Sequence, residues 1–218
     1  MAQVFDRGLV LALKIGTLLA VATLATLLFA WRWNIDYPHA IGSAPHQPLP
    51  FSHQHHVRDD GIDCRYCHVA VEQSAYAGMP STEICMSCHS QLFRDVALFE
   101  PLHRSMRTGA RLLWTRVHDL PDFVYFDHSA HVSHGVACQQ CHGRIDEMPL
   151  THKVHDLDMQ WCLSCHRDPA KHLSPRAALF TFRSDAAAGP AVENSAELLR
   201  QYHVLSDRIL TDCSTCHR

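Results

Sequence analysis

Residues 64–68 of this 218-residue chain read Cys64-Arg65-Tyr66-Cys67-His68, and four further segments repeat the same Cys-x-x-Cys-His pattern. They are Cys85-Met86-Ser87-Cys88-His89, Cys138-Gln139-Gln140-Cys141-His142, Cys162-Leu163-Ser164-Cys165-His166 and Cys213-Ser214-Thr215-Cys216-His217. The five motifs use all ten cysteines of the chain. This pattern is the attachment signature of c-type haem.

The spacing of the motif has a mechanical reason. Positions i, i+3 and i+4 of a helical turn lie on one face. The two thiols can therefore bond to the two vinyl groups of one haem, while the adjacent imidazole reaches the iron as proximal ligand. The predicted proximal ligands are His68, His89, His142, His166 and His217. We therefore predict five covalently bound haem c groups, each held by the two cysteines of its motif.

Two other uses of paired cysteines compete with this interpretation. Structural zinc sites contain Cys-x-x-Cys pairs, and ten cysteines could form five disulfides. Neither chemistry requires a histidine directly after each pair, whereas all five pairs here have one. Haem attachment is therefore the favoured reading.

Residues 8–31 form an apolar run of 24 residues, 18 of them hydrophobic. At about 1.5 Å per residue, a helix of this length spans the roughly 30 Å hydrocarbon core of a bilayer. Lys14 is its one charge, and Trp31, Trp33 and Tyr37 follow as an interfacial aromatic belt. The apolar region of a cleaved signal peptide is shorter, about 7–15 residues, and ends at a small-x-small site. We predict a retained signal anchor.

The expected orientation follows from haem chemistry more than from charge. Arg7 before the run and Lys14 near its N-terminal end, against Arg32 after it, give only a weak positive-inside bias. Haem c attachment is completed on the outer side of the plasma membrane. We therefore expect a single-pass protein of the bacterial inner membrane, with residues 1–7 cytoplasmic. Residues 32–50 are predicted to be a proline-containing linker that leads into a periplasmic haem domain.

An internal repeat organises the outer domain. Phe51-Ser52-His53-Gln54-His55-His56-Val57 matches Phe126-Asp127-His128-Ser129-Ala130-His131-Val132 as F-x-H-x-x-H-V. Each copy precedes a Gly-x-x-Cys-x-x-Cys-His segment and then a second motif, and the offset between copies stays at 74–77 residues. We predict two dihaem modules, residues 51–100 and 126–172, joined by a connector at 101–125. The C-terminal segment, 173–218, carries the fifth haem.

The repeated histidines are the predicted distal ligands. Low-spin haem iron takes two axial ligands, and each attachment motif supplies one. The H-x-x-H spacing places two imidazoles one helical turn apart, which suits a module with two irons. The distal set is His53, His56, His128 and His131. Spacing alone leaves open which of them serves which haem.

The fifth distal ligand is less well specified by the sequence. We favour His118, which lies ten residues before the second H-x-x-H. The alternatives are His203, Met148 and Met159. A methionine ligand would raise the potential of that haem relative to a bis-histidine haem.

Regular secondary structure is expected to be sparse. Helical and strand periodicity is weak between the motifs, and prolines such as Pro101, Pro169 and Pro175 are expected to break the chain into short pieces. The predicted fold is one N-terminal transmembrane α-helix plus a mostly irregular, α-poor multihaem cytochrome c domain with short helices around the motifs. A longer helix is predicted from Asn194 to about Leu205, and a flexible loop at 184–190. The haems must supply the core, so the apoprotein is not expected to fold.

Composition excludes some functions. The net charge of −3 gives no basic excess for nucleic-acid binding. All five motifs are regular and 19 histidines are available to close every iron, so an open catalytic iron is not expected. Five macrocycles in so small a domain would be close neighbours. The sequence therefore favours an electron conduit over an enzyme.

The segments PFSHQHHV, GIDCRYCH, AGMPSTEICMSCHS, WTRVHDLPDFVYFDHSAHV, GVACQQCHGRIDEMPL, WCLSCHR and CSTCHR together resemble the pentahaem cytochrome c subunit of bacterial alternative complex III. The resemblance covers roughly residues 50–218. It implies a quinol-oxidising respiratory or photosynthetic membrane complex, in which an iron–sulfur subunit passes electrons to the pentahaem subunit and a monohaem cytochrome c receives them. Neighbouring multi-span subunits would handle the quinol.

A second class of protein shares one helix and several haems. It comprises small membrane-anchored multihaem quinol dehydrogenases that feed periplasmic reductases. In that class the first haem lies at the membrane beside a quinol site. Here 32 residues separate Trp31 from Cys64, which favours the conduit.

Overall fold

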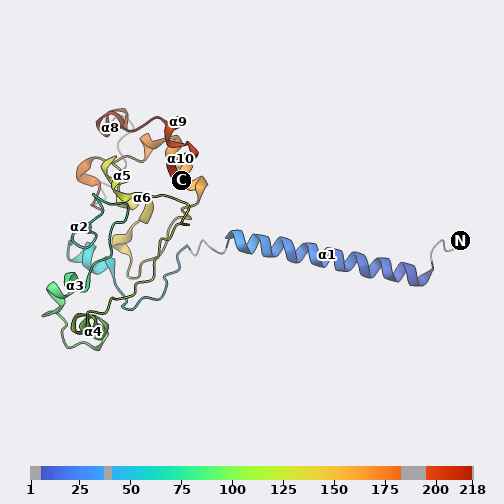
Figure 1. Ribbon diagram of the computed structural model, residues 1–218, viewed down its shortest axis with the longest axis horizontal. Coiled ribbons are helices and arrows are strands. Elements are labelled where there is room, and N and C mark those ends of the chain that lie inside the picture. The colour runs from blue at the N-terminus through green and yellow to red at the C-terminus, as the bar shows by residue number, and fades with distance from the viewer. Residues whose placement is uncertain (1–5, 37–40, 183–194, 218) are drawn as a thin grey trace. The chain divides into compact units, whose positions relative to one another are not determined.

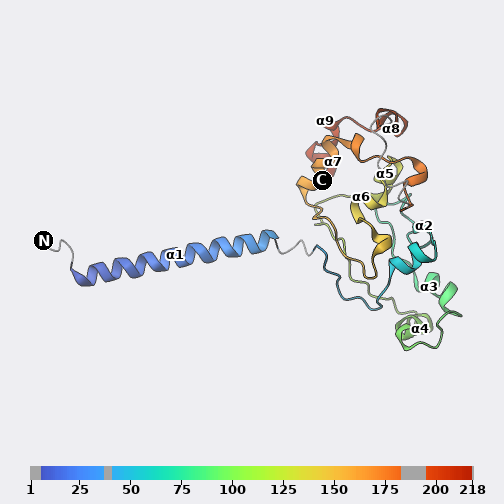
Figure 2. The same ribbon diagram turned by 180° about the vertical axis from the view of Figure 1, so that it is seen from behind.

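The computed structural model describes residues 6–36, 41–182 and 195–217. The chain forms two compact units, one that contains the long helix α1 and one that begins at Ile41. Figures 1 and 2 show the elements of each unit from two sides.

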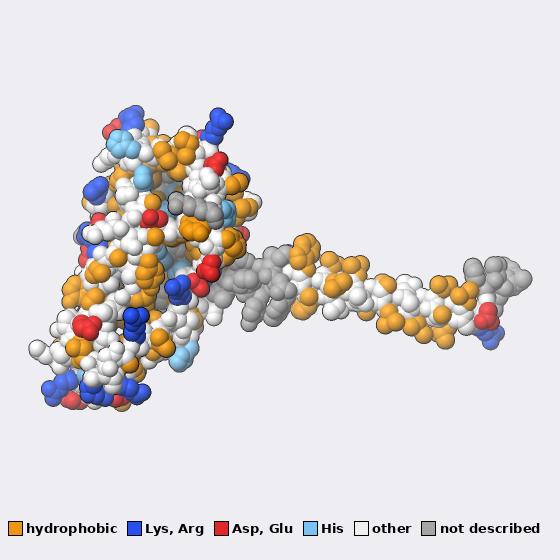
Figure 3. All heavy atoms as spheres, viewed as in Figure 1, with side chains coloured by type: hydrophobic (Ala, Val, Ile, Leu, Met, Phe, Trp, Pro, Cys, Tyr) orange, Lys and Arg blue, Asp and Glu red, His pale blue; other side chains and the backbone are white. Residues whose placement is uncertain are grey.

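Helix α1 (Arg7–Asp36) contains the apolar run. Its segment Arg7–Arg32 is long and apolar enough to cross a membrane, with a mean hydropathy of 2.0 and none of its apolar window buried. Hydrophobic side chains line it (Figure 3). Thr17, Thr23 and Thr26 donate their hydroxyl hydrogens to carbonyls four residues earlier, at 2.8–2.9 Å, which satisfies polar groups that lipid could not. The helix fits a single-pass membrane anchor.

Part of the predicted membrane interface lies outside the described residues. Tyr37 is one such residue, and nothing is described of the Trp33 side chain. Trp31, which is described, is 62% exposed at the end of the apolar run.

The unit that begins at Ile41 is built from short helices. Its α-helices are α2 (Cys64–Cys67), α3 (Thr82–His89), α4 (Glu100–Thr108), α5 (His128–Ser133), α6 (Cys138–His142), α7 (Met159–Arg167), α8 (Ser195–Gln201), α9 (Asp207–Leu210) and α10 (Cys213–Cys216). A π-helix, η2 (Gln54–Asp59), and the 3-10 helices η3 (Ala97–Phe99), η4 (Ile145–Glu147), η5 (Pro169–Lys171) and η6 (Arg176–Ala178) complete the set. The described residues contain no β-strand, only two isolated bridges, Ile41 with Lys153 and Val136 with Leu173. The predicted fold class is confirmed.

Every attachment motif lies on one of these short helices, and aspartates begin three of them. Asp63, Asp158 and Asp212 are the N-cap residues of α2, α7 and α10, and each side chain accepts a hydrogen bond from a backbone N–H of the first turn. Such capping satisfies N–H groups that have no partner within the helix. It lets helices of as few as four residues form around the cysteines.

The described residues test two predictions about helix boundaries, and one is wrong in detail. Pro101 lies at such a boundary: η3 ends at Phe99, and Pro101 stands in the first turn of α4, where proline is favoured because its missing N–H would be unpaired anyway. Helix α8 ends at Gln201 and not near Leu205, because His203 adopts a left-handed φ of 51°. The predicted N-cap, Asn194, and the predicted loop at 184–190 lie outside the described residues.

The apolar core of this unit is small and divided. One cluster joins Val71, Val132, Ala137 and Leu179, and a second joins Leu173, Leu198 and Tyr202. In the second cluster, the Tyr202 hydroxyl donates to the Ser174 carbonyl at 2.9 Å. Neither cluster contains a histidine.

Candidate haem attachment sites

The ten cysteines of the motifs all lie within the described residues. All ten are free thiols. Among the described residues, no group of three or more His, Cys, Asp or Glu side chains is arranged to hold a metal ion.

The two F-x-H-x-x-H segments adopt nearly the same side-chain geometry. The Phe51 ring lies edge-on to His53 at 4.9 Å and stacks on His56 at 4.5 Å. The equivalent Phe126 lies edge-on to His128 at 4.8 Å and stacks on His131 at 4.5 Å. Each phenylalanine thus contacts one imidazole edge-on and the other face to face, which holds the two imidazoles in different orientations. The sequence repeat is also a structural repeat.

Three of these imidazoles stand opposite a motif histidine. The ring centroids are 6.1 Å apart for His56 and His89, 6.4 Å for His128 and His142, and 6.1 Å for His131 and His166. Two imidazoles on opposite sides of one metal place their centroids about 6 Å apart, because each metal–nitrogen bond is about 2 Å long. The spacing in all three pairs therefore leaves room for one iron.

Hydrogen bonds at Nδ1 orient most of the candidate ligands. An imidazole that binds metal through Nε2 usually donates its Nδ1–H to a carbonyl or similar group, which fixes its tautomer and ring plane. Such Nδ1 contacts to backbone carbonyls, at 2.7–3.3 Å, occur at His56, His68, His89, His128, His131, His166 and His217. In His53 the partner is the Thr151 hydroxyl, at 2.8 Å. The Nε2 atoms of these rings are left for another partner.

Burial keeps several of these imidazoles neutral. Burial, and then the charges of His68 and His56, lower the pKa of His53 to about 4. Burial, and then the charge of His118, lower the pKa of His142 to about 3. Burial also lowers the pKa of His131. Only a neutral imidazole has a free lone pair for a metal, so these pKa shifts keep the rings in the metal-binding form.

His118, the candidate fifth ligand, lies beside the third motif. Its ring centroid is 4.3 Å from that of His142 in an edge-to-face arrangement, which is too close for the two to share one iron. Its Nε2 is buried without a hydrogen-bond partner. An orphaned nitrogen of this kind fits an atom that awaits a metal. His118 is also five residues from Phe123, whose carbonyl accepts from His217 of the fifth motif at 3.1 Å.

The alternatives to His118 differ in their exposure to solvent. Met148 is 4% exposed, Met159 is 61% exposed, and His203 is exposed at the end of α8. The Nε2 of His103 is also buried without a hydrogen-bond partner, on α4, which packs against α3 of the second motif. No sequence signal distinguished His103 from the other histidines outside the repeat.

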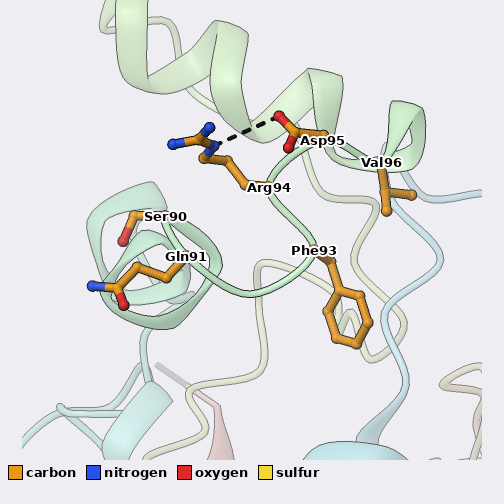
Figure 4. A pocket seen from close by; sticks show the side chains of 6 residues that line it. All are labelled: Ser90, Gln91, Phe93, Arg94, Asp95 and Val96. Carbon is orange, nitrogen blue, oxygen red and sulfur yellow. Dashed lines mark ion pairs between the residues drawn. The ribbon is translucent and has the colours of Figure 1, made fainter.

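A pocket of about 620 Å³ follows the second motif (Figure 4). It is lined by Ser90, Gln91, Phe93, Arg94, Asp95 and Val96. Arg94 and Asp95 form an ion pair at 3.6 Å, while Phe93 adopts a left-handed φ of 58°. The Phe93 ring lies 6.4 Å from that of His89. Phe93 therefore places an aromatic ring beside His89 of the second motif.

Contacts between motif segments connect the first three motifs. The hydroxyls of Tyr66 in the first motif and Ser87 in the second are 2.9 Å apart. The side chains of Cys64 in the first motif and Cys138 in the third lie close enough to interact with each other. The first motif thus adjoins both the second and the third.

The remaining contacts extend the series to the fifth motif. Helix α5 links the third and fourth motifs, because its His128 faces His142 and its His131 faces His166. His166 donates through Nδ1 to the carbonyl of Leu210 at 2.8 Å, three residues before the fifth motif, and α7 packs against α9. The motifs therefore adjoin in the order second, first, third, fourth, fifth. Figure 1 shows α3, α2, α6 and α10 succeeding one another in this way.

Comparison with known proteins supports the cytochrome c character of these motifs. No family model matches the chain. The multihaem cytochrome c subunit of menaquinone reductase from Nitratidesulfovibrio vulgaris (strain Hildenborough) is 35% identical over 136 residues, which cover 62% of this chain. The match also covers 62% of that protein, so the chain spans less than two thirds of its relative's length. The five motifs and this similarity together support covalently bound haem c.

Proposed function

We propose that this chain is a membrane-anchored pentahaem cytochrome c that conducts electrons within a quinol-oxidising complex and is not an enzyme by itself. The unbroken contact of the five motifs carries the proposal. Haem, when bound, supplies an iron that accepts and releases one electron. The chain's own residues would hold each haem by two thioethers, exclude water and fix the ring planes of the axial imidazoles.

The proposed axial pairs follow from the ring spacings. His56 pairs with His89, His128 with His142, and His131 with His166. His53 pairs with His68 by the equivalence of the two repeats, since His53 and His128 occupy the same position. Each module would then use its first histidine for its first haem and its second histidine for its second haem. His118 remains the proposed distal ligand of the fifth haem, opposite His217.

The proposed partners come from the resemblance and from the relative. The relative is a subunit of a menaquinone reductase, which supports a quinone-linked complex. We assign to this chain the arrangement implied by alternative complex III. An iron–sulfur subunit would deliver electrons, multi-span subunits would bind the quinol, and a monohaem cytochrome c or another periplasmic acceptor would receive them. The N-terminus would be cytoplasmic and the haem domain periplasmic.

Purification in mild detergent tests the proposal. A pyridine haemochrome assay should give about five haems per chain, and mass spectrometry should identify an iron–sulfur protein and multi-span proteins that co-purify. Electron paramagnetic resonance should show low-spin haems only. His118→Ala should turn one of them high-spin. A count well below five, or a high-spin iron in the unaltered protein, would contradict the proposal.

A second experiment separates a conduit from a small quinol dehydrogenase. The purified chain alone, with its five haems, is mixed with a menaquinol analogue. We expect no haem reduction without the other subunits, while dithionite reduces every haem as the positive control. Reduction by the quinol analogue alone would favour a quinol site on this chain.

A further inference from the structure

The two dihaem modules contact each other through equivalent residues. Gln54 and Ser129 occupy the same position of the repeat, and so do Ser74 and Met148, each six residues after the first proximal histidine of its module. The Ser129 N–H donates to the Ser74 carbonyl at 3.2 Å, and the Gln54 N–H donates to the Met148 carbonyl at 3.1 Å. Equivalent residues therefore form the same hydrogen bond twice. In one bond the second module donates to the first, and in the other the first module donates to the second.

Reciprocal contacts of this kind define a local two-fold relation. In an isologous interface, residue i of one copy contacts residue j of the other, and j contacts i. Equivalent residues near the axis then meet each other. The side chains of the equivalent Cys64 and Cys138 do interact with each other. Beside them, the Phe180 carbonyl accepts from Cys64 Sγ at 3.8 Å and the Leu179 carbonyl accepts from the Cys138 N–H at 3.2 Å.

Contacts between the two modules also involve the imidazoles of the repeated histidines. His128 of the second module donates through Nδ1 to the carbonyl of Ala75 in the first module, at 2.8 Å. In the opposite direction, His53 of the first module contacts the hydroxyl of Thr151 in the second module through Nδ1, also at 2.8 Å. His53 is a proposed Nε2 ligand, so its Nδ1 carries the hydrogen and Thr151 Oγ1 accepts it.

We infer that the two dihaem modules face each other about a local two-fold axis, and that each module orients the first distal histidine of the other. Thr151 is thereby a positioning residue for a haem that is attached to the other module. The first and third attachment sites lie at the centre of the four sites that belong to the two modules, and neither module is complete without its neighbour. This inference rests on the proposed haem ligation by His53 and His128.

Thr151→Val in the full-length, haem-loaded protein tests the inference, with Thr151→Ser as the matched control. Valine has nearly the shape of threonine but cannot accept the hydrogen bond from His53. A hydrogen bond from Nδ1–H to an acceptor makes an imidazole a more basic ligand. Without that bond, His53 would donate less electron density to its iron. We expect an upward shift in the midpoint potential and a changed g-value for one haem only. Serine should restore both.

The affected haem is identified with His53→Met and His128→Met. A methionine ligand changes the resonance signal of the haem it serves. The signal that Thr151→Val shifts should be the one that His53→Met replaces. If the shifted signal is the one that His128→Met replaces, or if no signal shifts while five low-spin haems are present, the inference is wrong. Fewer than five haems in the unaltered protein would instead contradict the proposed function.

A measurement on the unaltered protein covers the case in which a methionine variant fails to mature. In the fully reduced, isotope-labelled protein, nuclear Overhauser contacts should join the Thr151 side chain to the His53 ring. Contacts should also join Ala75 to His128. Absence of both contacts from a spectrum that resolves these residues would overturn the inference.

Discussion

Gly61 and Gly135 occupy the same position of the two repeats, three residues before the first cysteine of each module. Both have left-handed φ values, 71° and 84°. Their surroundings differ, because a Cβ at Gly61 would meet nothing within 4 Å, whereas one at Gly135 would collide with the Tyr202 ring. In the second repeat, the missing side chain at Gly135 thus leaves room for the Tyr202 ring of the C-terminal segment.

We expect Gly135→Ala to destabilise the haem-loaded protein more than Gly61→Ala does. Both changes place an alanine in the left-handed region, at a cost of about 1–2 kcal/mol. Only Gly135→Ala also displaces the Tyr202 ring, which adds about 1–3 kcal/mol of overpacking. Denaturant unfolding followed by circular dichroism of the haem bands measures the difference. Equal losses for the two variants would mean that Tyr202 does not pack on Gly135 in solution.

At the scale of the element, the motif helices are too short to form by themselves. Isolated helices shorter than about 12–15 residues are marginal in water. Here α2 and α10 have four residues each, and α7, the longest motif helix, has nine. Local capping and attachment to the haem must therefore hold them in place.

Asp158→Ala tests the contribution of capping. Its carboxylate accepts a hydrogen bond from the Trp161 N–H at 2.7 Å at the start of α7. Loss of such a cap costs about 1 kcal/mol, while asparagine caps nearly as well as aspartate. We expect Asp158→Ala to lower the midpoint of thermal unfolding and Asp158→Asn to leave it close to that of the unaltered protein. A fall of equal size in both variants would assign the effect to the lost charge and not to the cap.

The elements also show which features sequence reasoning could reach. The repeat was predictable because identical residues recur at a near-constant offset, and Phe51 and Phe126 make identical ring contacts. The α8 boundary was not, because nothing local to His203 signals its left-handed φ. The contact of Thr151 with His53 was also out of reach, since it joins residues 98 positions apart.

At the scale of the whole molecule, apolar burial is scarce. The described residues include only twelve buried hydrophobic side chains, and seven of these form two separate small clusters. Many large apolar side chains beside the motifs are exposed, among them Phe93 at 59% and Tyr66 at 50%. Haem macrocycles are large and apolar, and they would lie between the paired imidazoles. They would therefore cover such exposed apolar side chains.

Haem supply should therefore decide whether the unit that begins at Ile41 folds. We expect the chain produced in cells that cannot attach haem c to lack fixed tertiary structure, because binding energy that exists only in the folded state is itself folding energy. Limited proteolysis of membranes compares the two samples. The haem-loaded protein should resist cleavage after Ile41, and the haem-free chain should be digested down to a fragment that contains α1. The bilayer still protects that helix, so the fragment serves as the internal control for expression and insertion. A haem-free chain with the protease resistance of the loaded protein would show that the polypeptide alone builds the core.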